Sequence, residues 1–281
     1  MRIIPYKRIV ESVKRLCLDA AFDLPKDAVR ALSAAKKKEK SASGRALLAA
    51  MGDNARIARR DCVPICQDTG IAVFFVDMGC NVRIRGGTLT DGINEGTRLG
   101  YARGYLRPSM VSDPLFQRRN TRTNTPAVIH CSPTKGNKLS ITLAPKGGGS
   151  ENMSRLVMLK PADGEAGVVD AAVETVTKAG GNPCPPVIVG IGIGGTAETA
   201  MLLSKKALLR PLGRGNPDKR FAVLERKIFD KVNSTGVGPG GLGGTVTALG
   251  VHIETFPCHI ATLPVAVSLL CHAARHASVT L

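Results

Sequence analysis

Three of the eight cysteines lie in segments unlike ordinary protein core. Cys66, in PICQDTG, is followed by an amide, a carboxylate and a hydroxyl before a glycine closes the segment. Cys184 lies among three prolines in GGNPCPP, where proline fixes the backbone and removes competing N–H groups. Cys271 follows an apolar run and opens the segment CHAARH. Three loop thiolates could converge on one metal cluster, and simple burial of the thiols is the alternative.

The cysteine spacing excludes the common local metal motifs. None of the eight forms a C-x-x-C pair, so zinc-ribbon and ferredoxin spacings are absent. Disulfides are not the expected use of cysteine in a cytosolic protein of this size. Cys17 falls on the apolar face of a predicted helix and is interpreted as core.

A glycine-rich segment imitates a dinucleotide-binding fingerprint. Gly190 to Gly195 fits G-x-G-x-x-G after an apolar run and before a predicted helix. The acidic residue wanted about 20 positions later would fall in a loop, between Gly213 and Asp218, instead of at a second strand end. We therefore interpret these glycines as sites of close helix–sheet packing, with an anion site at the helix N-terminus as a further reading.

Several longer runs together carry a family resemblance. They are PICQDTG, KGGGSENMSRL (146–156), AGGNPCPP (179–186) with GIGIGGTAE, GVGPGGLGGTVTALGVHIE (236–254) and the closing CHIATLPVAVSLLCHAARHA. In this order they resemble the N-terminal, cluster-binding part of class I fumarases and the α subunit of L(+)-tartrate dehydratase. The resemblance covers nearly the whole chain.

The resemblance implies a [4Fe–4S] cluster held by Cys66, Cys184 and Cys271, with one iron open to substrate. That iron would act as a Lewis acid in a hydro-lyase that adds or removes water on a four-carbon dicarboxylate, fumarate/malate or tartrate/oxaloacetate. Cys258 is a competing choice of third ligand because it stands beside His259, but the family pattern favours Cys271.

The resemblance and the chemistry together suggest the catalytic groups. Gln67 and Asp68 adjoin Cys66, so we expect Asp68 to act as acid or base and Gln67 to bind a substrate carboxylate. His259 matches a family active-site histidine contributed across a subunit interface. Without the family, a core histidine would be the simpler interpretation of His259.

Substrate binding is expected to involve one arginine and a glycine loop. Arg107 matches a family arginine that clamps a carboxylate, and a surface arginine is the alternative. Gly148 and Gly149 match a loop that presents backbone N–H groups to substrate, with the choice of glycine open by one position. The family usually has glycine where this chain has Arg122, so Arg122 would be strained if that loop needs a positive φ.

Composition bounds the remaining function classes. The chain has 281 residues, 4% aromatic content, no Trp and a net charge of +17. A basic nucleic-acid-binding protein is one alternative, although no aromatic residues interleave with the basic ones to stack on bases. A non-catalytic iron–sulfur protein is another. No apolar stretch is long enough to cross a membrane, and the first residues lack the apolar run of a signal peptide, so we expect a cytoplasmic protein.

Hydrophobic periodicity predicts an α+β fold, with mixed and antiparallel sheets surrounded by helices and a helical N-terminal third. One domain is expected over 1–281. The expected helices cover 9–20, 25–35, 47–58, 90–106 with a cap at Thr90–Asp91, 166–178, 196–209 and 218–232. The expected strands are 71–76, 186–193, 245–253, 265–270 and a hairpin of 127–131 with 139–143.

The resemblance also implies a partner. Single-chain relatives carry a second domain with further carboxylate-binding residues, whereas this chain stops soon after Cys271. We therefore expect a separate β subunit that completes the active site, and an α2β2 assembly.

Overall fold

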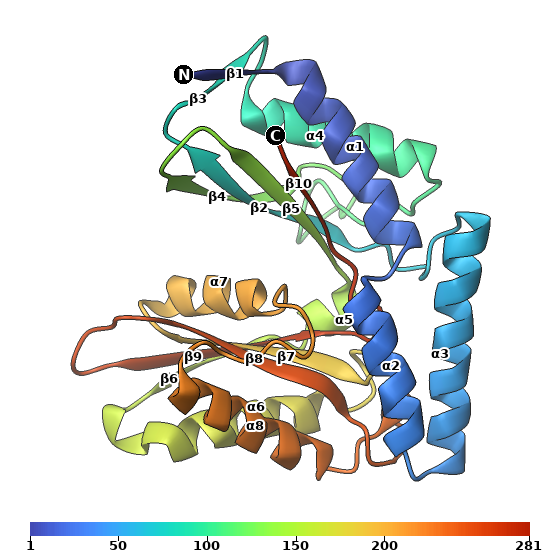
Figure 1. Ribbon diagram of the computed structural model, residues 1–281, viewed down its shortest axis with the longest axis vertical. Helices are drawn as coiled ribbons and strands as arrows, with labels where there is room; N and C mark the ends of the chain where they lie inside the picture. The colour runs from blue at the N-terminus through green and yellow to red at the C-terminus, as the bar shows by residue number, and fades with distance from the viewer. The chain divides into compact units, whose positions relative to one another are not determined.

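The computed structural model describes residues 1–281 and divides the chain into two compact units. The first unit comprises residues 1–25, 54–148 and 275–281, and the second comprises 26–53 and 149–274. Both are mixtures of helix and sheet, as Figure 1 shows, which confirms the predicted α+β class. That the chain works as one catalytic domain stays a prediction.

The first unit is built on a four-stranded sheet in the order β10-β5-β2-β4. Its strands are β2 (Ile71–Gly79), β4 (Val128–Thr134), β5 (Leu139–Lys146) and β10 (Ala277–Thr280), and a separate parallel pair joins β1 (Arg2–Pro5) to β3 (Val82–Arg85). The predicted hairpin of β4 with β5 is wrong, because β2 lies between them, parallel to β4 and antiparallel to β5. β2 carries a nearly continuous apolar run, as the central strand of a sheet should.

Two helices of the first unit pack closely because one of them is lined with glycine. They are α1 (Tyr6–Phe22) and α4 (Leu89–Arg103). An added Cβ at Gly96 would lie 2.6 Å from the Cβ of Val13 on α1, and Gly92 and Gly100 are similarly close to that helix. α4 is capped by Thr88, whose hydroxyl accepts from the Asp91 N–H, and not by the predicted Thr90–Asp91.

The second unit contains a sheet in the order β6-β9-β7-β8, with helices on both faces. The strands are β6 (Arg155–Leu159), β7 (Val187–Gly194), β8 (Ala248–Phe256) and β9 (Leu263–Leu270), and the helices are α6 (Gly164–Ala179), α7 (Ala197–Ala207) and α8 (Lys219–Asn233). In Figure 1, α7 covers one face, and α6 and α8 cover the other. The buried residues between them are aliphatic, mainly Val, Ile, Leu and Ala.

The glycines of β7 allow α7 to pack closely on the sheet, which agrees with the interpretation made from the sequence. An added Cβ at Gly190 or Gly192 would lie 2.2 Å or 2.0 Å from backbone oxygens of α7, so any side chain there would displace the helix. The remaining helices are α2 (Lys26–Lys38), α3 (Ala42–Asp61), the single turn α5 (Gly148–Glu151) and two short 3₁₀ turns, Pro161–Asp163 and Pro239–Gly241. None of the helices is long and apolar enough to cross a membrane.

Candidate active site

In the first unit, Asp68 is fixed by two backbone groups that come from different parts of the sequence. Its Oδ1 accepts from the Gly70 N–H at 3.1 Å, and its Oδ2 accepts from the Gly148 N–H at 2.8 Å. The sheet causes this meeting, because Ile71 at the start of β2 pairs with Lys146 at the end of antiparallel β5. The loop before β2 and the loop after β5 therefore lie side by side at one end of the strands, and the Asp68 carboxylate links them.

Cys66 and Gln67 lie in the same loop. The Cys66 thiol donates to the Gln67 side-chain oxygen at 3.3 Å, and the Gln67 side chain is otherwise exposed. Ile65 anchors the start of this loop, because its N–H donates to the Ala21 carbonyl and its carbonyl accepts from the Asn54 amide. The thiol is therefore held by an anchored backbone, next to the exposed Gln67 amide and the oriented Asp68 carboxylate.

The Arg107 guanidinium lies near the same carboxylate but does not form a close ion pair with it. Its Nη2 lies 3.6 Å from Asp68 Oδ1, and 60% of its side chain is exposed. An exposed ion pair of this length contributes little to stability. The guanidinium is therefore available to a second carboxylate, such as that of a bound acid.

Three buried polar side chains lie behind this loop, and the sequence analysis did not identify them. The Thr69 hydroxyl donates to the Arg107 carbonyl at 2.6 Å, and the Tyr101 hydroxyl is 3.1 Å from the carbonyls of Thr69 and of Gly70. The Asn124 amide also donates to the Gly70 carbonyl, at 3.2 Å. Burial raises the pKa of the Tyr101 hydroxyl well above its ordinary value, so this group remains a hydrogen-bond donor.

Arg275 is a further buried cation that the sequence analysis missed. Only 2% of Arg275 is exposed, and its Nε has no hydrogen-bond partner. A Cβ added to Gly147 would lie 3.0 Å from Asp68 Oδ2 and 3.9 Å from Arg275 Nη2, so both groups flank that glycine. Its position directly before β10, which pairs with β5, brings Arg275 to this edge of the sheet. The sequence signal was a lone arginine among small residues after an apolar strand.

In the second unit, Cys184 and Cys271 lie at one end of the sheet. Cys184 precedes β7 and Cys271 follows β9, which is antiparallel to β7. The backbone N–H and the ring Nδ1 of His272 both approach the Cys184 carbonyl, at 3.3 and 3.1 Å. Cys184 has a φ of +53°, which is uncommon for a residue with a Cβ and typical of functional loops. Gly149 packs against this loop, because its Cβ would lie 2.7 Å from the Asn182 carbonyl.

His259 lies at the opposite end of the second unit's sheet. It follows β8, which runs parallel to β7, so the length of β7 separates it from Cys184. The His259 Nδ1 accepts from the Ala261 N–H at 3.1 Å, so the neutral ring carries its proton on Nε2. The ring is exposed, which excludes the core-histidine alternative.

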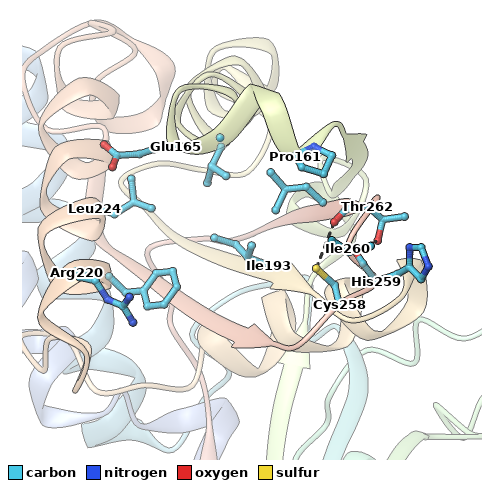
Figure 2. Close-up of a pocket in the computed structure, with 13 residues that line it drawn as sticks. Pro161, Glu165, Ile193, Arg220, Leu224, Cys258, His259, Ile260 and Thr262 are labelled. Atoms are coloured by element: carbon cyan, nitrogen blue, oxygen red, sulfur yellow. Dashed lines mark hydrogen bonds between the residues drawn. The ribbon is translucent and has the colours of Figure 1, made fainter.

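The loop that carries His259 borders a pocket of about 510 Å³, drawn in Figure 2. Most of the lining is apolar, and Glu165 and Arg220 are its charged residues. The Cys258 thiol in this pocket donates to the Thr262 carbonyl at 3.3 Å, the bond dashed in Figure 2. Cys258 is thus at the far end of the sheet from Cys271.

Arg122 has a φ of +61°, the strained conformation that the sequence comparison with glycine suggested. Its side chain is exposed and its N–H donates to the Asn120 side chain. Arg122 therefore has the positive φ that is usual for glycine.

The Asp68 carboxylate is a group that can exchange a proton, and the exposed Arg107 guanidinium is a group that can bind an anion. The chain belongs to the fumarate hydratase (fumerase) family, whose profile matches residues 10–280. The family is one of hydro-lyases, and this chain is a hydro-lyase of that class.

Individual relatives are similar over almost their whole length. A chain of Methanocaldococcus jannaschii, provisionally named L(+)-tartrate dehydratase subunit alpha, is 43% identical over 275 residues, which are 96% of this chain and 96% of the relative. The L(+)-tartrate dehydratase subunit alpha of Escherichia coli K12 is 34% identical over 273 residues, covering 95% of this chain and 89% of the relative.

Proposed function

We propose that this chain is the cluster-binding α subunit of an iron–sulfur hydro-lyase that acts on four-carbon dicarboxylates. The observation that carries the proposal is the Asp68 carboxylate, held by two backbone N–H groups beside Cys66, with Arg107 Nη2 3.6 Å away. An anionic substrate needs a cation to bind it and a group to move its proton, and Arg107 and Asp68 provide these two groups.

The donor set fits a cluster held by three thiolates. Cys184 and Cys271 lie on loops at one end of one sheet, and Cys66 lies on an anchored polar loop of the other unit. The structure gathers no group of three or more metal-binding side chains, so the assignment of Cys66, Cys184 and Cys271 to one cluster rests on the family resemblance. A bound [4Fe–4S] cluster of this type would supply a Lewis acid that polarises a substrate hydroxyl.

The chain's own residues then have distinct tasks. Asp68 is oriented through both oxygens and would exchange the proton of the departing or entering water. Arg107 would hold one substrate carboxylate by two parallel hydrogen bonds. Gln67 is exposed next to Cys66 and would hydrogen-bond a carboxylate oxygen. Of the two loop glycines, Gly148 already donates its N–H to Asp68, so Gly149 is the one with an N–H to offer substrate.

His259 would act in another copy of the chain. The eight residues of β7 separate its end of the sheet from the Cys184 end, which is about 26 Å at ~3.3 Å per residue. A hydrogen bond to a substrate at Cys184 and Cys271 of the same chain is therefore out of reach. The exposed loop of residues 257–262 is suited to enter a second subunit, which agrees with the active site between chains that the resemblance implies.

The proposed partner is a β subunit, since the relatives are named as α subunits of a dehydratase. An α2β2 assembly in the cytoplasm would provide both the second α chain and the β subunits. We propose fumarate/malate or tartrate/oxaloacetate as the substrate pairs, which share a four-carbon chain with a carboxylate at each end.

The first experiment reconstitutes the chain anaerobically with iron and sulfide, and adds a β subunit of the tartrate dehydratase type. We expect blue-region absorbance, a three-iron EPR signal after brief oxidation, and turnover of one of the three acids fumarate, malate or tartrate. Cys271→Ala should lose the cluster, whereas Cys258→Ala should keep it. A Cys271→Ala protein with a full cluster would refute the ligand assignment, and a wild-type chain without iron would refute the proposed function.

The role of His259 is tested by mixing two inactive proteins. Asp68→Asn and His259→Ala assemblies are expected to be inactive alone, and co-expression should restore activity at sites that receive both wild-type residues. No restoration in verified mixed assemblies would show that both residues act in one chain.

A further inference from the structure

Asn124 is completely buried, and its amide links the two segments that carry the proposed chemistry. Its Oδ1 accepts from the Ser109 N–H at 2.7 Å, two residues after Arg107. Its Nδ2 donates to the Gly70 carbonyl at 3.2 Å, two residues after Asp68. One side chain therefore ties the backbone behind the guanidinium to the backbone behind the carboxylate.

The chemistry of the contacts requires an amide. One end must accept and the other must donate, which neither a carboxylate nor an aliphatic side chain can do. Asn124 also has a φ of +55°, a left-handed conformation that asparagine tolerates better than most residues. With 0% exposure, water cannot replace either bond if the amide is removed.

Other hydrogen bonds near Arg107 use mainly its carbonyl and its neighbours. The Thr69 and Ser109 hydroxyls donate to the Arg107 carbonyl, and the Asn120 amide donates to the Pro108 carbonyl in an exposed part of the loop. On the N-terminal side, the Leu106 N–H donates to the Tyr101 carbonyl. Pro108 itself has no N–H. Ser109 is therefore the first residue after Arg107 whose N–H can anchor the segment, and Asn124 supplies its acceptor.

We propose that Asn124 is a positioning residue that fixes Arg107 relative to Asp68 and thereby sets the binding of the substrate carboxylate. This inference rests on the proposed function for the role of Arg107, while the anchoring itself rests only on the contacts above. The prediction is that loss of the Asn124 amide weakens substrate binding more than it slows the chemical step.

Asn94 offers a matched control. Its Oδ1 accepts from the Ala127 N–H at 2.8 Å, so it anchors the same loop three residues beyond Asn124 without touching Ser109 or Gly70. Asn94→Ala should lower thermal stability like Asn124→Ala but leave the Arg107 segment in place.

The test compares these variants in the reconstituted enzyme with its β subunit. Because misplacement of a binding group by about 1 Å can cost ~100-fold, we expect Asn124→Ala to lower kcat/KM by about 10- to 100-fold, mostly through KM. Asn94→Ala should keep KM within about threefold of wild type. Equal effects of the two variants on KM, or an unchanged KM in Asn124→Ala, would overturn the proposal.

A second readout does not depend on activity. Hydrogen–deuterium exchange should speed up in peptides that contain Ser109 in Asn124→Ala, and should stay slow there in Asn94→Ala. If the wild-type complex turns over none of the three acids, the proposed function fails, and exchange at Ser109 alone decides whether Asn124 anchors this segment. Unchanged exchange at Ser109 would refute the anchoring.

A conservative variant covers the case in which Asn124→Ala does not fold. Asn124→Asp keeps the acceptor for Ser109 but places an oxygen against the Gly70 carbonyl. It should raise KM by about 3- to 10-fold with kcat largely retained. A wild-type KM, or a loss confined to kcat, would overturn the proposal in that case.

Discussion

Glu39 should be a principal determinant of stability in the second unit. Only 2% of this residue is exposed, and its carboxylate is surrounded by hydrogen-bond donors. The backbone N–H groups of Ser41, Thr245 and Val246 donate to it at 2.8 to 3.0 Å, and the Thr245 hydroxyl donates at 3.3 Å. It therefore holds the loop before β8 against the turn that joins α2 to α3.

The cost of Glu39→Gln follows from these contacts. In the variant, the side-chain amide oxygen can still accept hydrogen bonds. The amide NH2 group, which replaces the second carboxylate oxygen, faces N–H donors, so about two hydrogen bonds are lost. A hydrogen bond to a charged group contributes about 1.5 kcal/mol or more, so we expect a loss of about 3 kcal/mol in the free energy of unfolding. The variant should also loosen the neighbouring glycine-rich loop, in which the Gly240 N–H donates to the carbonyl of Pro185, beside Cys184.

The effect should depend on pH in a defined direction. Burial raises the pKa of Glu39, but the N–H groups of Ser41, Thr245 and Val246 outweigh it and lower the pKa below its ordinary value. A lowered folded-state pKa stabilises the protein above the unfolded pKa of about 4.3, and this stabilisation is lost as pH falls through the folded value. The difference between wild type and Glu39→Gln should therefore be full near pH 7 and shrink below about pH 4.

Urea unfolding followed by circular dichroism measures this difference at both pH values. Glu165→Gln is the control, because Glu165 is exposed and its pair with Lys227 should contribute less than about 1 kcal/mol. A loss below about 1 kcal/mol for Glu39→Gln, or one equally large near pH 3.5, would refute the reasoning.

Two further substitutions test packing and buried charge. Gly96→Ala should destabilise the protein by about 1–2 kcal/mol, because the cost of overpacking against α1 exceeds the gain in helix propensity. The control Gly52→Ala, which has no atoms within 4 Å of the added methyl group, should stabilise the protein slightly. A higher melting temperature for Gly96→Ala would contradict this. Glu225→Gln should cost about 3 kcal/mol in urea unfolding, because it leaves the Arg210 guanidinium, 9% exposed, without its buried partner. A loss like that of Glu165→Gln would show that Arg210 finds compensation in Glu254.

Local periodicity was sufficient to predict most helices and the buried strands. The stretch 166–178 shows regular apolar spacing followed by glycine, and α6 ends at Ala179, directly before Gly180, which has a φ of +52°. The hairpin prediction failed because periodicity identifies strands without identifying neighbours. The short turn between β4 and β5 favours direct pairing, but the buried run of β2 takes the central position between them.

The candidate site was predictable where a sequence motif contains the candidate residue. Asp68 was chosen because it adjoins Cys66, and Arg107 was chosen from the resemblance; the structure places Arg107 Nη2 3.6 Å from Asp68 Oδ1. Asn124, Tyr101 and Arg275 were not identified, because each acts through contacts with residues far away in the sequence. A buried asparagine looks like any loop asparagine until the partners of its amide are known.

The two units use the same arrangement to bring distant loops together. In the first unit the Cys66 loop leads into β2, and the glycine loop follows its antiparallel neighbour β5. In the second unit the Cys184 loop leads into β7, and Cys271 follows its antiparallel neighbour β9. An antiparallel pair places the start of one strand beside the end of the other. Segments separated by about 80 residues in the sequence therefore lie next to each other. A cysteine in a polar or proline-rich loop directly before a buried strand is therefore the sequence signal that locates both halves of the proposed site.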